Sequence, residues 1–416
     1  MSAELISILV LVAVFAIATT RSINMGALSF AAAFGVGTLV AGLDADGIFA
    51  GFPGDLFVVL VGITYLFALA RANGTTDWLV HGAVRLVGGR VALIPWMMFA
   101  ITGLLTAIGA VSPAAVAIVA PIALGFATRY KISPLMMGVM IVHGAQGGGF
   151  SPISIYGSIV NGIVDKEGLA GSPVFLFLAS LVVNLVISAV VFVLLGGLKL
   201  PRYSADRGET ETDPDRDKLN PMRITTLVAL AALVIGVLFF ELDAGLTAIT
   251  LAVVLSVVWP KSSKDAVSQI TWSTVLLICG VVTYVAVLEE MGTIDYAGDS
   301  VSQIGIPLLS ALLICYVGAI VSAFASSVGI MGALIPLAVP FLAMGEIGAI
   351  GMITALAVSS TVVDVSPFST NGALVLASAP EVDRDRFFKQ LMVYGGIVVA
   401  VVPLLVWLAL VVPGFG

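Results

Sequence analysis

Apolar residues form long runs along the whole chain, and short polar segments separate them. Eight runs come close to the ~20 residues that a helix needs to cross a bilayer; they lie near residues 4–20, 24–43, 55–72, 173–198, 222–241, 245–259, 271–289 and 389–413. Four further apolar stretches are longer and are interrupted in the middle by Pro, Gly or Ser; they are residues 92–130, 133–164, 306–344 and 346–379. As one straight helix, each would measure more than about 45 Å. We therefore expect all four to be broken.

The composition supports a membrane protein. Hydrophobic residues make up 60% of the 416 residues and charged residues only 10%, whereas a soluble domain is about 25% charged. This excludes a soluble enzyme, a nucleic-acid-binding protein and a disordered chain, and it makes the lipid bilayer the surroundings of the fold. The two cysteines lie in apolar segments and indicate neither a disulfide framework nor a thiolate metal site. The predicted class is an all-α polytopic membrane protein.

The basic residues test one arrangement of these segments. If 92–130 and 306–344 are re-entrant hairpins and 133–164 and 346–379 are interrupted spans, the chain has ten transmembrane spans and two hairpins. Of the 18 Lys and Arg residues, all but Lys166 then lie on one side. Because basic loops face the cytoplasm, this side is predicted to be cytoplasmic, with both termini outside.

The two halves of the chain share a repeated pattern. Ser151-Pro152-x-Ser154-x-x-Gly157 recurs 215 residues later from Ser366, and Ser112 and Pro121 recur with the same offset as Ser327 and Pro336. Five spans are an odd number, so the second copy is expected to be inverted, with hairpin 92–130 opening to the cytoplasm and hairpin 306–344 to the outside. We divide the chain into a first repeat, a cytoplasmic linker and a second repeat, at 1–198, 199–221 and 222–416. Inverted repeats with interrupted helices at matching positions are typical of secondary transporters.

The interrupted segments carry chemistry suited to an anion and a small cation. Helix N-termini present N–H donors and partial positive charge, and free carbonyl and hydroxyl oxygens suit Na⁺. No Lys or Arg lies at a hairpin tip or a break, so the charge of an anion must be met by helix ends, hydroxyls and bound cations. This favours cation symport of a small carboxylate. The candidate substrate-binding residues are Ser112, Pro113, Gln146, Ser151, Pro152, Ser154, Ser326, Ser327, Ser366, Pro367, Ser369 and Asn371.

Two ionisable residues, His143 and Asp364, fall inside the membrane segments. Such residues are candidates for function. Asp364 could be a cation ligand or a proton site, or a carboxylate held by local hydroxyls for structure. His143 could take part in transport or form a hydrogen bond in helix packing. Tyr156 and Asn371 follow the two breaks and could contact substrate or cap helix segments.

At these positions the sequence resembles the ion-transporter superfamily, specifically the divalent anion:sodium symporters and, most of all, the MatC-type dicarboxylate (malonate) carriers. In that family each hairpin tip carries Ser-Asn-Thr, with a proline nine residues after the Asn. The second tip, Ser326-Ser327-Val328, matches with Pro336, and the first tip, Val111-Ser112-Pro113, matches loosely with Pro121. The family's Thr-Pro-x-Asn in the broken spans resembles the two Ser-Pro-x-Ser segments.

The resemblance implies an elevator mechanism in a homodimer, in the inner membrane of a bacterium. Hairpins and broken spans would form a transport domain that slides past a scaffold of the other helices. Sodium would bind between each hairpin tip and its neighbouring break, and the dicarboxylate, such as malonate or a C4 acid, between the two tips. No organic cofactor is expected. The candidate ligands of Na⁺ are Ser112, Gly147, Gly148, Ser327, Thr361 and Asp364.

Departures from the family pattern leave other functions open. Both tip Asn positions hold Ser, Pro113 stands where Thr is expected, and Asp364 adds a negative charge. A cation/proton antiporter on the same fold would use Asp364 as its exchanging carboxylate. An ion channel with the hairpins as filter is a further alternative, although hairpins of opposite orientation suit alternating access better. An enzyme is not expected, because no zinc-binding pair or Ser–His arrangement is present.

Overall fold

The computed structural model describes residues 2–416 except 22, 77, 80–89, 202–218, 241, 294, 295, 297–306, 324–326, 344, 346 and 380–382. The first half contains α1 (Ala3–Arg21), α2 (Met25–Leu39), α3 (Ala45–Ala50), α4 (Gly54–Ala72), η1 (Val91–Leu93), α6 (Ile94–Ala107), α7 (Ser112–Arg129), α8 (Pro134–Gly148), α9 (Ile155–Lys166), α10 (Pro173–Leu194) and η2 (Gly197–Lys199). The second contains α12 (Pro221–Phe240), α13 (Ala244–Val258), α14 (Pro260–Ser263), η3 (Val267–Gln269), α15 (Trp272–Glu290), α17 (Pro307–Ser322), α18 (Ser327–Ala343), α19 (Ala349–Val362), α20 (Thr370–Ala377), α21 (Arg384–Val406) and a π-helical turn (Trp407–Val411). The described residues form helices and no strand, which confirms the predicted all-α class.

The four long apolar segments are each divided into two helices. Helices α6 and α7 fall within 92–130 and pack against each other, as do α17 and α18 within 306–344. Segment 133–164 contains α8 and α9, and segment 346–379 contains α19 and α20. The breaks occur where Gly, Ser and Pro are concentrated, because these residues terminate or cap helices more readily than they continue them. Most of the expected linker 199–221 lies outside the described residues.

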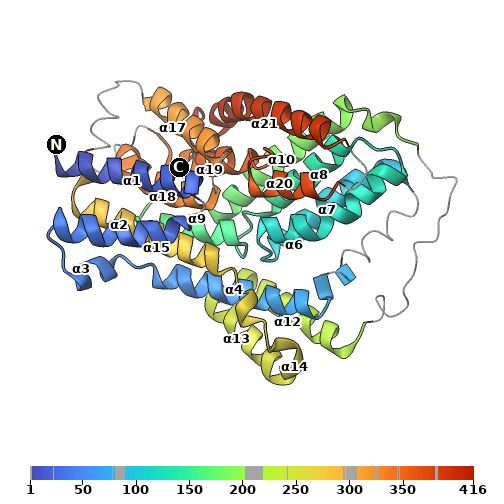
Figure 1. The fold of residues 1–416 in the computed structure, drawn as a ribbon, viewed down its shortest axis with the longest axis horizontal. Helices are drawn as coiled ribbons and strands as arrows, with labels where there is room; N and C mark the ends of the chain where they lie inside the picture. The colour runs from blue at the N-terminus through green and yellow to red at the C-terminus, as the bar shows by residue number, and fades with distance from the viewer. Residues whose placement is uncertain are drawn as a thin grey trace.

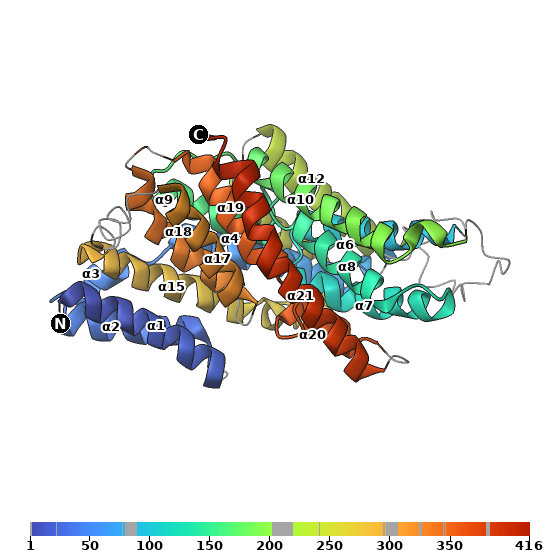
Figure 2. The same cartoon turned by 90° about the horizontal axis from the view of Figure 1, so that it is seen from above.

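The helices contact each other in two groups. Helices α1, α2, α4, α12, α13 and α15 pack among themselves, and so do α6, α7, α8, α9, α10, α17, α18, α19, α20 and α21. In Figure 1, α2, α15, α4 and α13 lie along the lower side and α21 along the upper side; Figure 2 shows the same molecule from above. Contacts of α15 with α18 and of α4 with α9 join the groups.

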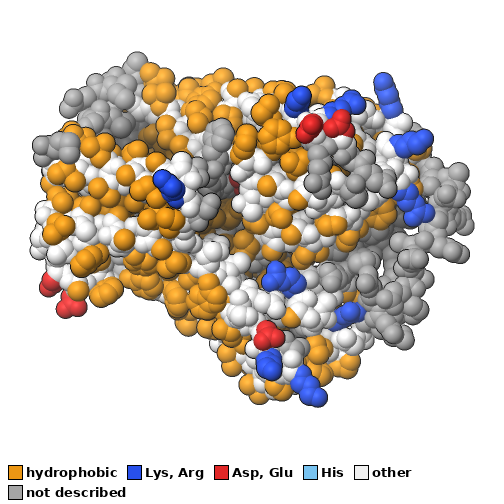
Figure 3. Space-filling view, viewed as in Figure 1, with side chains coloured by type: hydrophobic (Ala, Val, Ile, Leu, Met, Phe, Trp, Pro, Cys, Tyr) orange, Lys and Arg blue, Asp and Glu red, His pale blue; other side chains and the backbone are white. Residues whose placement is uncertain are grey.

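Several helices have the length and apolar character of membrane spans. Within the described part of the chain, five meet both criteria: Gly54–Ala72, Ser112–Arg129, Pro173–Leu194, Trp272–Glu290 and Asp385–Val411. Helix α10 exposes Val174, Leu178 and Val182 along one face, as expected for a helix in contact with lipid. Figure 3 shows hydrophobic side chains over much of the described surface and a gathering of Lys and Arg toward the end of the molecule where α7 ends and α21 begins. The number of spans remains a prediction.

Candidate functional site

The two breaks have the same local structure. In the first, the hydroxyl of Ser154 donates to the carbonyls of Gly149 and Ser151 and accepts from the Gly157 amide, so it caps α9. In the second, Ser369 donates to the carbonyls of Asp364 and Ser366 and accepts from the Gly372 amide, so it caps α20. The second Ser of each Ser-Pro-x-Ser motif thus begins a new helix inside the protein.

The glycine that ends each motif is required by close backbone contact. A Cβ at Gly157 would lie 2.0 Å from the carbonyl oxygen of Ser151, and a Cβ at Gly372 would lie 2.0 Å from that of Ser366. These distances leave no room for a side chain. The repeated sequence pattern therefore encodes one tight turn, used twice.

Asp364 lies at the centre of a polar cluster that joins both halves. The Ser327 hydroxyl at the second hairpin tip donates to its Oδ1 at 2.5 Å, and the Gln146 amide at the first break donates to its Oδ2 at 2.7 Å. Ser327 in turn accepts from Ser322 of α17 at 2.8 Å. Asp364 is 6% exposed, and both of its side-chain donors are neutral.

A second contact between the halves joins the first hairpin tip to the second break. Asn371 donates through Nδ2 to the Ser112 hydroxyl at 2.9 Å, and both side chains are buried. The side chain of Tyr156 interacts with those of Ser112 and Gln146 and with the charge of Asp364. Tyr156 and Asn371 follow the two breaks in the sequence. Both therefore lie beside the first hairpin tip and the Asp364 carboxylate.

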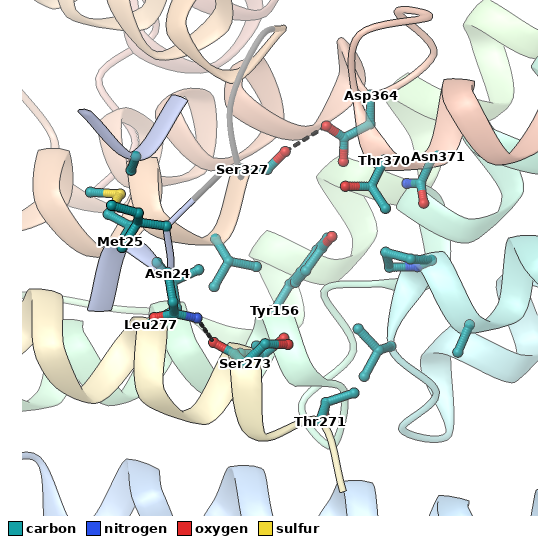
Figure 4. A pocket seen from close by; sticks show the side chains of 17 residues that line it. Asn24, Met25, Tyr156, Thr271, Ser273, Leu277, Ser327, Asp364, Thr370 and Asn371 are labelled. Atoms are coloured by element: carbon teal, nitrogen blue, oxygen red, sulfur yellow. Dashed lines mark hydrogen bonds between the residues drawn. The ribbon is translucent and has the colours of Figure 1, made fainter. Parts of the chain in front are cut away.

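Of these residues, Tyr156, Ser327, Asp364 and Asn371 line a cavity of about 520 Å³. Figure 4 shows Asp364, Thr370 and Asn371 on one side, Tyr156 reaching between them and the opposite wall, and Asn24, Thr271 and Ser273 on that wall. None of the described residues that line it is Lys or Arg. The lining is Ala18, Ile23, Asn24, Met25, Val111, Pro113, Ala114, Tyr156, Thr271, Ser273, Thr274, Leu277, Ser327, Val328, Asp364, Thr370 and Asn371.

Six helices begin at the wall of this cavity. The lining includes the N-cap or a residue of the first turn of α2, α7, α9, α15, α18 and α20; representative members are Asn24, Val111, Tyr156, Thr271, Ser327 and Thr370. A helix N-terminus carries partial positive charge and N–H groups without partners in the helix, although side chains of Asn24, Ser154 and Ser369 already accept from one or more of these groups in α2, α9 and α20. The helix starts therefore give the cavity wall partial positive charge without a cationic side chain among the described lining residues, while the Asp364 carboxylate adds negative charge to the same wall.

The other residues singled out from the sequence lie around the breaks in packing or capping positions. Ser151 donates to the carbonyl of Ala107 in the first hairpin, and Pro152 is half-buried beside it. Ser366 accepts from the Phe368 amide at 3.3 Å, and Pro367 is buried. Ser326 lies outside the described residues.

Some of the residues expected to bind Na⁺ lie in packing positions, and others line the cavity. Gly147 and Gly148 pack closely against neighbouring helices. A Cβ at Gly147 would lie 3.4 Å from Asn184 Cβ, and a Cβ at Gly148 would lie 1.9 Å from the carbonyl oxygen of Gly103. Thr361 is buried and donates to the Ala357 carbonyl in its own helix, which leaves its lone pairs unused. The structure brings only Ser327 and Asp364 of this set into direct contact with the cavity.

His143 lies in a separate polar network away from the cavity. It is fully buried, with Nδ1 2.7 Å from Asn184 Oδ1 of α10 and Nε2 2.7 Å from the Tyr394 hydroxyl of α21. Asn184 also donates to the Ser180 carbonyl, which fixes its amide and leaves Oδ1 as an acceptor. His143 therefore carries its proton on Nδ1 and holds α8, α10 and α21 together.

We expect His143→Ala to destabilise the protein without a change in substrate affinity. The change leaves the buried Asn184 Oδ1 and the hydroxyl of the half-buried Tyr394 without their partner, which costs about 1–3 kcal/mol. A lower melting temperature in detergent, with an apparent substrate constant within twofold of wild type, would match this role. Tyr316→Phe, which removes an exposed hydrogen bond to the Ala400 carbonyl, is the control and should change neither quantity. A shift of the substrate constant in His143→Ala would instead place His143 in the transport site.

Sequence reasoning missed one wall of the cavity. Asn24 and Met25 at the start of α2, and Thr271, Ser273 and Thr274 at the start of α15, lie outside the repeated motifs. Asn24 accepts from the Gly26 amide and donates to the Ser273 carbonyl at 3.0 Å, so it joins the two helix starts. A polar residue just before an apolar run is an N-cap signal, and that signal was present at both positions.

Comparisons with known proteins agree with this fold and with the motif resemblance. Residues 1–149 match the family model of the N-terminus of the dicarboxylate carrier protein MatC, and residues 244–414 match the family model of the citrate transporter. None of the curated proteins matches the sequence. The crystal structure of the Alcanivorax borkumensis YdaH transporter superposes with a TM-score of 0.61 over 88% of this chain and 89% of that one, at 17% sequence identity. The two family matches confirm the resemblance to the MatC-type dicarboxylate carriers, and the chain is a multi-pass membrane transport protein, not an enzyme.

Proposed function

We propose that the protein is a secondary active transporter that takes up a small dicarboxylate, such as malonate or a C4 acid, together with Na⁺. The observation that carries this proposal is that six helices begin at a cavity whose described lining residues include no Lys or Arg. Backbone N–H groups at helix starts suit carboxylate oxygens. The dicarboxylate and citrate carrier families matched by the two ends of the chain transport ligands of this class by name.

The role of the cation follows from the charge balance in the cavity. Asp364 contributes a negative charge, and a dicarboxylate adds two more. At about 5 Å and an effective dielectric constant near 20, two like charges repel by roughly 3 kcal/mol. Cations that bind with the substrate offset this repulsion, so substrate and cation bind together. Asp364 and Ser327, which line the cavity, supply carboxylate and hydroxyl oxygens for a hard monovalent cation.

The arrangement of the helices supports an elevator movement. The cavity lies between the two helix groups: α2 and α15 form one wall, and α7, α9, α18 and α20 form the other. A displacement of the second group relative to the first would carry a bound ligand past a fixed wall. In this proposal α2 and α15 belong to the scaffold, and the protein works as a homodimer in the inner membrane of a bacterium.

Uptake into proteoliposomes tests the proposed function. Labelled malonate and succinate should accumulate above their outside concentrations when an inward Na⁺ gradient is imposed, and only equilibrate when Na⁺ is equal on both sides. Protein-free liposomes are the control. Accumulation of neither acid under a Na⁺ gradient would contradict the proposal, and Na⁺ or H⁺ exchange without any carboxylate would favour the antiporter that uses Asp364.

A further inference from the structure

A groove of about 600 Å³ lies at the start of α21 and includes residues from the start of α8 and the end of α10. Leu135 belongs to the first turn of α8 and Leu195 follows α10, whereas the other lining residues belong to α21 and its N-cap. The groove shares none of its described lining residues with the cavity at Asp364. The distribution of Lys and Arg in the sequence predicts that these three helix ends face the cytoplasm.

Charged side chains of both signs line the groove where α21 begins. Arg386 and Lys389 are basic, Asp383 and Asp385 are acidic, and all four are exposed. Figure 3 shows Lys or Arg beside Asp or Glu side chains at this end of α21. Asp383 Oδ1 accepts from the Arg386 amide at 3.2 Å and so caps the helix. The first two turns of α21 therefore offer contacts for a negative group and for a positive group.

The same face of α21 becomes apolar farther along the helix. Val393 and Ile397 line the groove and are 59% and 55% exposed. The exposed apolar face continues at intervals of three or four residues through Val401, Leu404 and Leu408. These residues belong to a segment with the length and composition of a membrane span. A ligand that matches the whole face is amphipathic, with a charged end and a hydrocarbon chain.

Tyr394 connects the groove to the buried network at His143. Its side chain lines the groove, and its hydroxyl lies 2.7 Å from His143 Nε2. A ligand in the groove covers Tyr394 and keeps water from this hydrogen bond, which is electrostatically stronger in surroundings of low dielectric constant. Ligand binding is therefore expected to stabilise the packing of α21 against α8.

We propose that the groove binds one phosphatidylethanolamine molecule from the cytoplasmic leaflet. Arg386 and Lys389 pair with its phosphate, Asp385 pairs with its ammonium group, and an acyl chain lies over Val393 and Ile397. Basic residues at the cytoplasmic ends of membrane helices bind lipid head groups. Phosphatidylglycerol has no positive group for Asp385, and the choline of phosphatidylcholine has no N–H to donate, so both fit the groove less well.

Native mass spectrometry of the detergent-purified protein tests this selection. The protein is titrated with phosphatidylethanolamine, phosphatidylglycerol and phosphatidylcholine that carry the same acyl chains. The dissociation constant should be about two- to fivefold lower for phosphatidylethanolamine than for the other two lipids, as expected for one added ion pair at an exposed site. Equal constants for the three lipids would overturn the inference, and so would tighter binding of phosphatidylglycerol, because the basic residues alone would then attract the lipid.

Variants assign the two parts of the head group to their partners. Arg386→Gln/Lys389→Gln should weaken binding of phosphatidylethanolamine and phosphatidylglycerol at least about tenfold. Asp385→Asn should weaken phosphatidylethanolamine alone, so that it binds no more tightly than phosphatidylcholine. If Asp385→Asn preserves the preference, the groove does not recognise the ammonium group and the inference fails.

The matched controls remove equal charges outside the groove. Arg129→Gln/Lys131→Gln removes two exposed basic side chains on the same predicted side of the membrane, and Asp165→Asn removes one exposed carboxylate. Both should bind all three lipids as wild type does. An equal loss of binding in the basic control would mean that charge anywhere on this side suffices, which contradicts a site in the groove.

The melting temperature of the wild-type protein provides a test that needs no variant. Phosphatidylethanolamine should raise it more than phosphatidylglycerol or phosphatidylcholine at equal concentration, because only the bound lipid stabilises the folded state. The same small rise with all three lipids would contradict the proposal. Neither measurement requires Na⁺ or a dicarboxylate, so their outcome is independent of the proposed transport function.

Discussion

Asp364→Asn should lower Na⁺-driven accumulation of substrate by about tenfold or more while the protein remains folded. A charge-assisted contact is worth about 1.5–3 kcal/mol, and each 1.4 kcal/mol is a factor of ten. The amide can still accept from Ser327. The unpaired Oε1 of Gln146 can accept from the new NH₂ group once the Gln146 amide turns over. The variant therefore removes the charge and retains the hydrogen bonds.

Initial rates of uptake at several Na⁺ concentrations measure this effect. We expect a loss of Na⁺ dependence, with exchange of internal for external substrate retained. Asp165→Asn is the matched control, because Asp165 is exposed in α9 on the other side of the first break, and it should leave uptake as in wild type. If Asp364→Asn shows the same Na⁺-dependent uptake as wild type, Asp364 has only a structural role.

Gly148→Ala should unfold or severely destabilise the protein. Helix α8 meets α6 through Gly144 and Gly148, spaced four residues apart, and a methyl group on Gly148 would lie 1.9 Å from the carbonyl oxygen of Gly103. Small residues at this spacing let membrane helices approach closely. Backbone cannot yield as a flexible side chain can, so we expect a cost of about 3 kcal/mol or more.

The melting temperature and the monodisperse fraction in detergent measure this cost. Gly125→Ala is the control. Gly125 lies in α7, the helix that follows α6 in the first hairpin, and a Cβ there would meet no atom within 4 Å. It should be neutral or stabilising by up to about 1 kcal/mol, as for other exposed helix glycines. A Gly148→Ala protein as stable as Gly125→Ala would mean that α6 and α8 are packed differently.

The division of the long apolar segments could be predicted because Pro, Gly and Ser interrupt them. Helix α7 begins at Ser112, and α20 begins at Thr370, immediately after the second Ser-Pro-x-Ser motif. These boundaries depend on capping and turn chemistry, which acts over a few residues and is legible in the sequence.

The contacts between the halves could not be predicted in the same way. The repeat offset pairs Asp364 with Gly149 and Tyr156 with Asn371, but the structure joins Asp364 to Gln146 and Asn371 to Ser112. The contacts between side chains of the two halves depend on how the helices pack. Local sequence patterns do not determine this packing. The helix starts at Asn24 and Thr271 could be recognised from their sequence, but their position at the cavity depends on the packing of α2 and α15 and could not be predicted.

Protection of a cysteine in the cavity tests most directly whether carboxylates bind there. Thr370 lines the cavity and is exposed to it, so Thr370→Cys should react with a small charged maleimide. Both native cysteines are buried, which makes the wild type the unreactive control, and Asp165→Cys reports reactivity away from the site. We predict that malate with Na⁺ slows labelling at position 370 at least about tenfold, as expected at ligand concentrations well above the dissociation constant, and leaves position 165 unchanged. Equal labelling rates at position 370 with and without an acid that the protein transports would contradict the account.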